Sequence, residues 1–132
     1  MQKLMRLSLM VLAPAVAMPA WAQSSDCGKL QGSASILVPF ASESITISST
    51  ALGFTMATAF PAAGNGAQQA CVTVAVDSVR YWPDGTIPSA TVGHIADSGS
   101  SFSVGVTSLR AIRFIRVTTD AILSVTYMRP SQ

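Results

Sequence analysis

Hydrophobic and polar residues alternate along the second half of the chain, in short runs separated by turn-forming residues. An alternation with a period of two is typical of strands with one buried face, and closely spaced turns favour antiparallel pairing. The clearest strand is predicted at residues 70–76, where Val72, Val74 and Val76 share one face and Cys71 lies on the other. The pattern therefore indicates a small antiparallel β domain.

The same reasoning places the remaining strands and the turns between them. Further strands are predicted at residues 36–40, 43–49, 79–82, 90–95, 101–106, 111–117 and 121–129. Pro83-Asp84-Gly85-Thr86 is typical of a type I turn with Gly85 in the left-handed conformation, and Asp77-Ser78 should turn or kink the chain. Seven to eight short strands and no helix after residue 22 predict an all-β fold, a sandwich or jelly roll formed by a single domain over residues 36–132.

The first 22 residues follow a different pattern, that of a secretory signal peptide. Lys3 and Arg6 precede an apolar run at residues 7–17, and Ala20-Trp21-Ala22 is a typical cleavage site. The run is too short for a stable membrane-spanning helix, which needs about 20 residues. We expect a signal-like helix over residues 1–22 and a flexible arm over residues 23–35. The alternatives are an uncleaved apolar helix and a start codon placed too early.

Export would place both cysteines, Cys27 and Cys71, in an oxidising compartment, where an even count favours a disulfide. A bridge between them would close a long loop and stabilise the fold by about 4 kcal/mol in the chain-entropy model. Two unpaired cysteines that pack as small hydrophobic side chains are the alternative.

Charge limits the possible partners. Only 11% of the residues are charged, and without Lys3 and Arg6 six basic residues face six acidic ones. A neutral chain lacks the clustered positive charge on which general nucleic-acid binding depends. We therefore expect no nucleic-acid partner.

No catalytic or metal-binding constellation is evident. His94 is the only histidine of the chain, and no G-x-S-x-G motif accompanies it. Two cysteines and one histidine are too few for a typical zinc site, and no calcium-loop spacing occurs. We expect a protein without cofactor or enzymatic activity. A small hydrolase built around His94 is the weakest of three hypotheses, and it fails if activity survives the substitution His94→Ala.

Two short segments are candidates for interaction. Arg113 and Arg116 flank a pair of apolar residues on one predicted strand, a pattern that binds single-stranded nucleic acid in some proteins but more often faces solvent or a partner. Tyr81 and Trp82, beside a proline, could stack on a sugar ring, although core packing or a subunit contact is the more common role.

The run R-Y-W-P-D-G-T-I-P-S-A-T-V-G at residues 80–93 resembles a pattern of small structural proteins of tailed phages and prophages, R-Y-x-x-D-G-T-x-P-T-x-x-x-G. A hydrophobic stretch like residues 109–116 and a final strand like residues 123–127 extend the resemblance over residues 70–129. Ser89 stands where that pattern has Thr. The resemblance implies a β-sandwich virion component, either a head decoration (cement) protein or a tail accessory. Arg80, the first residue of this run, is a further candidate interaction residue.

Two further hypotheses thus concern binding. The first is a non-enzymatic virion accessory that binds other protein subunits, as a homo-oligomer or together with capsid or tail proteins. The second is an exported periplasmic or cell-surface β-sandwich module, with carbohydrate as a possible ligand. The location would be the virion in the first case, and the periplasm or the extracellular space in the second.

Overall fold

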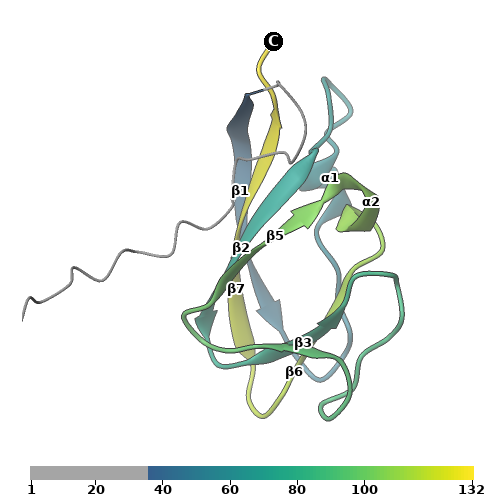
Figure 1. Cartoon of the computed structure of the whole chain (residues 1–132), viewed down its shortest axis with the longest axis vertical. Helices are drawn as coiled ribbons and strands as arrows, with labels where there is room; N and C mark the ends of the chain where they lie inside the picture. The colour runs from purple at the N-terminus through teal and green to yellow at the C-terminus, as the bar shows by residue number, and fades with distance from the viewer. Residues whose placement is uncertain (1–35) are drawn as a thin grey trace, which may run out of the picture.

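The predicted strands form two antiparallel sheets in a computed structural model that describes residues 36–132. In the first sheet the order is β1 (Leu37–Ile47), β7 (Ala121–Pro130), β2 (Gln69–Val76) and β5 (Ser101–Gly105). In the second the order is β4 (His94–Ala96), β3 (Val79–Trp82) and β6 (Arg113–Arg116). The all-β prediction is confirmed for this part of the chain (Figure 1). The leader, the arm and Cys27 lie outside the described residues.

Strand positions follow the alternation closely. On β7 the buried side chains are Ala121, Leu123, Val125 and Tyr127, with an exposed or half-buried residue between each pair. The predicted strand at residues 79–82 is β3 itself. The two predicted segments 36–40 and 43–49 belong to the single strand β1, whose pairing with β7 is irregular near Pro39. Proline has no N–H to donate to the ladder, which accounts for the irregularity.

Three sequence predictions were wrong in detail. Only residues 94 and 95 of the predicted strand 90–95 lie in a strand, β4, because the chain turns before them. Val106, predicted as the last residue of the strand 101–106, instead begins α2 (Val106–Leu109), a single helical turn. A second helical turn, α1 (Met56–Ala59), lies where no helix was predicted. The helical turn α2 buries Leu109, and α1 buries Ala59. The guanidinium of Arg110, directly after α2, lies 3.8 Å from the centre of the Phe60 ring, directly after α1, so the ends of the two turns are in contact.

The chain passes from the first sheet to the second at Asp77 and Ser78, where a turn or kink was predicted. Asp77 has φ +57°, and its carboxylate accepts hydrogen bonds from the Thr119 hydroxyl and from the Ser78 N–H (2.7 Å). The left-handed conformation is tolerated by Asp because its side chain can bond locally. The Thr119 hydroxyl, followed by the Ser78 N–H, lowers the pKa of the Asp77 carboxyl below its usual value.

Both sheets contribute to one core built around Phe114 of β6. Its ring lies 5.4 Å from Phe54, 6.0 Å from Tyr81 and 6.4 Å from Phe102, centre to centre. Phe54 in turn meets Tyr127 of the first sheet edge-on at 5.8 Å. Aromatic pairs at these separations are favourable beyond the area they bury. The rings therefore connect the two sheets.

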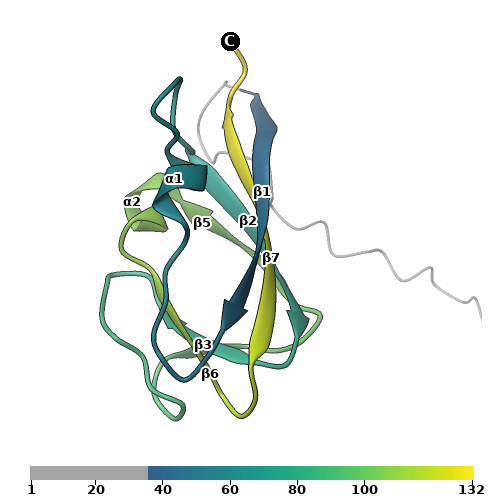
Figure 2. The same cartoon turned by 180° about the vertical axis from the view of Figure 1, so that it is seen from behind.

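The two ends of the described chain lie side by side. Leu37 at the start of β1 pairs with Pro130 at the end of β7, and the Ser131 N–H donates to the Ile36 carbonyl oxygen at 2.9 Å. Figure 2 shows β1 and β7 running together to the same end of the molecule.

Candidate functional site

The connection between β3 and β4, residues 83–93, is held by Arg80. The Nε of Arg80 donates to the carbonyl oxygen of Ala90 at 3.0 Å, and one terminal nitrogen donates to that of Gly93 at 2.8 Å. Both bonds are charge-assisted, the stronger class of protein hydrogen bond. Arg80, predicted as an interaction residue, thus has an internal role: it fixes the shape of the loop.

Local bonds explain why this loop does not continue as strand. The Ser89 hydroxyl accepts from the Thr91 N–H (3.3 Å) and the Val92 N–H (3.0 Å). Ser side chains that bond the following backbone compete with a sheet ladder in this way. At the start of the loop the Asp84 carboxylate accepts from the Thr86 N–H at 3.0 Å, and this bond lowers the pKa of Asp84 below its usual value.

Glycine is required at two points of the loop. Gly85 has φ +92°, as the turn prediction expected, and Gly93 has φ +132°. A Cβ on Gly93 would also lie 3.3 Å from the Pro88 side chain and from the Tyr81 carbonyl oxygen. Pro88 itself is buried. Most of the polar, Gly and Pro positions of residues 80–93 therefore serve to build the loop.

The loop leaves large apolar side chains in solvent. Ile87 is 73% exposed and Val92 58% exposed, and Ile95, opposite Arg80 on β4, is 51% exposed. Exposed apolar residues are common singly, but three of them within nine positions of one segment are a candidate for an interaction surface. We name Ile87, Val92 and Ile95 the loop surface.

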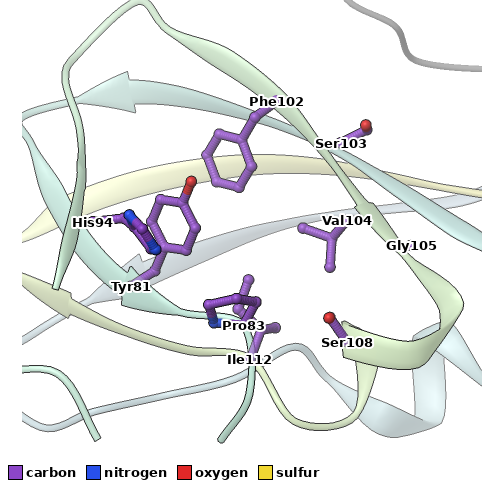
Figure 3. A pocket seen from close by; sticks show the side chains of 9 residues that line it. All are labelled: Tyr81, Pro83, His94, Phe102, Ser103, Val104, Gly105, Ser108 and Ile112. Carbon is purple, nitrogen blue, oxygen red and sulfur yellow. The ribbon is translucent and has the colours of Figure 1, made fainter. Parts of the chain in front are cut away.

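A pocket of about 280 Å³ lies between the edge strand β5 with α2 and the second sheet, and no residue of the loop surface lines it. Figure 3 shows Tyr81 and His94 on one side of it, Val104 and Ser108 on the other, and Pro83 near its base. Its remaining lining residues are Phe102, Ser103, Gly105 and Ile112.

Tyr81 and Trp82, predicted as possible sugar-stacking residues, are both in contact with His94. The centres of the Tyr81 and His94 rings lie 5.5 Å apart, and those of Trp82 and His94 lie 4.8 Å apart. Tyr81 also stacks on Phe102 at 4.9 Å with an angle of 5° between the rings. Tyr81 lines the pocket and Trp82 does not, so the structure separates two residues that the sequence grouped.

The two arginines predicted on one strand have separate internal contacts. A terminal nitrogen of Arg113 donates to the carbonyl oxygens of Ile112 (2.9 Å) and Ala111 (3.1 Å), which closes the turn between α2 and β6. Arg116 forms an exposed ion pair with Asp120. These contacts explain both residues within the fold, and a partner contact of either stays a prediction.

Cys71 lies on the outer face of β2, half-buried, with its sulfur 3.5 Å from that of Met128 on β7. The predicted bridge to Cys27 involves a residue outside the described part, and it stays a prediction.

A carboxylate contacts the core at one point. The Tyr127 hydroxyl donates to Glu43 of β1, and the same carboxylate oxygen accepts from the Thr55 N–H at 3.2 Å. Burial, together with the Glu43 carboxylate, raises the pKa of Tyr127 well above its usual value of 10. Within residues 36–132, no three His, Cys, Asp or Glu side chains gather as metal ligands would, and no helix is long and apolar enough to cross a membrane.

Sequence reasoning missed the residues of the pocket other than Tyr81 and His94. Ser108 belongs to a helical turn that the alternation did not reveal, and Phe102 reaches the pocket from the other sheet. The available signal was Gly105 within residues 101–106, because glycine weakens the interior of a strand.

Searches against protein-family models, curated proteins and solved structures give no match for this chain.

Proposed function

We propose that the protein is a non-enzymatic virion accessory of the phage type, a head decoration or tail-associated subunit that binds other protein subunits through the loop surface. The observation that carries the proposal is the fixed loop at residues 83–93, which exposes Ile87 and Val92 while Arg80 holds its backbone. A preorganised apolar surface loses little conformational entropy on binding, which favours association.

The proposal includes the finer fold class. Two antiparallel sheets that share one core support a β-sandwich, the architecture that the resemblance over residues 70–129 implies. The loop then lies on an outer connection of the sandwich, where insertions and binding residues are commonly found.

Particle association tests this function. Particles from producing cells are separated on a density gradient, and the protein is quantified in each fraction. We expect the wild-type chain with the particles, and the double variant Ile87→Ser, Val92→Ser in the soluble fractions. Val76→Ser is the matched control, because Val76 is 48% exposed on the other sheet, and it should stay with the particles. A wild-type chain absent from every particle fraction would contradict the proposal.

The second candidate, an exported binding module, is favoured by the pocket beside Tyr81. Intact mass with and without reductant, on protein from its native source, separates the two. A chain that begins at Gln23 and is two hydrogens lighter before reduction indicates export and the Cys27–Cys71 bridge. A full-length chain with free thiols favours assembly in the cytoplasm, as expected of a virion subunit.

A further inference from the structure

We propose that the pocket between β5 and the second sheet binds one ring of a neutral sugar, with Ser108 and Tyr81 as hydrogen-bonding residues. This inference goes beyond the virion role and does not depend on it, since it concerns residues that lie apart from Ile87 and Val92.

Much of the pocket lining is apolar. Pro83, Val104 and Ile112 form part of the wall, and the Tyr81 ring is already fixed by its stack on Phe102. The C–H faces of a pyranose ring pack well on apolar and aromatic surface, which is amphipathic in the same way as the sugar. The wall needs no rearrangement of Tyr81 to receive such a ring.

Several polar side chains that line the pocket can still form hydrogen bonds. Within residues 36–132, no side-chain hydrogen bond involves Tyr81, His94, Ser103 or Ser108. Figure 3 shows the Ser108 hydroxyl facing the pocket from α2, across from the Tyr81 ring. A small number of polar groups within an apolar lining is typical of a ligand site. An entirely apolar ligand would bury such groups without partners, which is unfavourable.

Charge and size narrow the ligand further. No Asp, Glu, Lys or Arg side chain lines the pocket, so nothing there would compensate a charged ligand. The volume of about 280 Å³ lies just below the range of roughly 300–1,000 Å³ that is usual for sites of drug-sized molecules. A single ring fits this volume better than an extended oligosaccharide.

The test titrates ¹⁵N-labelled full-length chain with methyl glycosides of glucose, galactose and N-acetylglucosamine, followed by amide chemical shifts. We expect saturable shifts at Ser108 and Gly105 with at least one glycoside, with a Kd on the order of 1 mM, as a ligand of this size allows. Ser108→Ala should weaken binding by about 5- to 10-fold, and Tyr81→Phe by a similar factor. Thr107→Ala, an exposed hydroxyl on the same helical turn, is the control and should leave Kd unchanged.

Two results would overturn the inference. One is the absence of saturable shifts with every glycoside up to about 50 mM, well above the expected Kd, while the spectra show a folded chain. The other is binding that Ser108→Ala and Thr107→Ala affect equally. A parallel titration with indole identifies the competing occupant: saturation by indole, unaffected by Ser108→Ala and without glycoside binding, would assign the pocket to an aromatic side chain of a partner protein.

Discussion

Arg80 and Arg116 lie on the neighbouring strands β3 and β6, yet their guanidinium groups bind different kinds of partner. Arg80 bonds two backbone carbonyls of one loop, and Arg116 pairs with an exposed carboxylate. Hydrogen bonds from a charged group to protein partners contribute about 1.5–3 kcal/mol each, whereas exposed ion pairs contribute about 0–1 kcal/mol. Arg80 should therefore contribute more than Arg116 to the free energy of unfolding.

The substitution Arg80→Met should lower the free energy of unfolding by about 2 kcal/mol, because the carbonyls of Ala90 and Gly93 lose their charged donor. Arg116→Met should lower it by less than about 1 kcal/mol. Urea unfolding followed by circular dichroism measures both. Equal losses in the two variants would show that Arg80 does not hold the loop.

A second residue-scale prediction concerns Tyr127 and pH. Its pKa is raised in the folded state, so folding favours the protonated hydroxyl. The corresponding stability is present below the pKa of the unfolded chain, about 10, and is lost as pH rises from there toward the folded pKa. We expect the unfolding free energy to fall above pH 10, by at most about 1.4 kcal/mol per pH unit from this group.

The variant Tyr127→Phe checks the assignment. It should be less stable than the wild type at pH 7 by about 1–2 kcal/mol, since the bond to Glu43 is lost. The difference between the two proteins should then shrink as pH rises above 10. A constant difference from pH 8 to pH 11.5, a span chosen to cross the unfolded pKa of about 10, would show that another group causes the alkaline loss.

Among the elements, the connection of β3 to β4 depends most on backbone conformation. Gly93→Ala should cost about 2–3 kcal/mol, because it combines a φ of +132° with contacts to Pro88 and the Tyr81 carbonyl. Gly99→Ala is the control: its φ is +85°, but a Cβ there meets nothing within 4 Å, so only about 1 kcal/mol should be lost. Thermal unfolding of both variants tests the order, and a larger loss for Gly99→Ala would contradict it.

The strands of this protein could be predicted from the sequence, but the connection of β3 to β4 could not. Strands such as β2, β5 and β7 could be predicted because a buried face imposes alternation on consecutive residues. The shape of the loop after Gly85 could not be predicted, since it depends on Arg80 and on the Ser89 hydroxyl. In addition, Thr91 and Val92 are residues that favour strands, so the sequence there is typical of a strand. The pocket was hidden for a related reason: Phe102 and Tyr81 meet only when two sheets come together.

For the whole molecule, the aromatic chain through Phe114 implies that the two sheets unfold together. Trp82 lies on the second sheet, and it is the only tryptophan among residues 36–132, so the measurement uses the variant Trp21→Phe. Its fluorescence and far-ultraviolet circular dichroism should therefore give coincident urea transitions, the usual sign of two-state unfolding. Separate midpoints would mean that the sheets form independent units.

Phe114→Ala tests the same connection by removing its central ring. Such truncations in a core cost about 3–5 kcal/mol, a large part of the 5–15 kcal/mol that is usual for a domain. We expect both spectroscopic signals to shift to lower urea by the same amount. Phe102→Ala, at the partly exposed end of the chain of rings, should cost less.

The pairing of Leu37 with Pro130 brings the two ends of the described chain to the same end of the molecule. Both ends of the described chain leave at one end of the first sheet, while residues 83–93 lie at the opposite end (Figure 1). A copy tethered through either end would therefore carry the loop of residues 83–93 on the part of the molecule far from its anchor. An array of such copies, on a particle or on an engineered scaffold joined at Gln132, would hold this loop at the same distance from every attachment point.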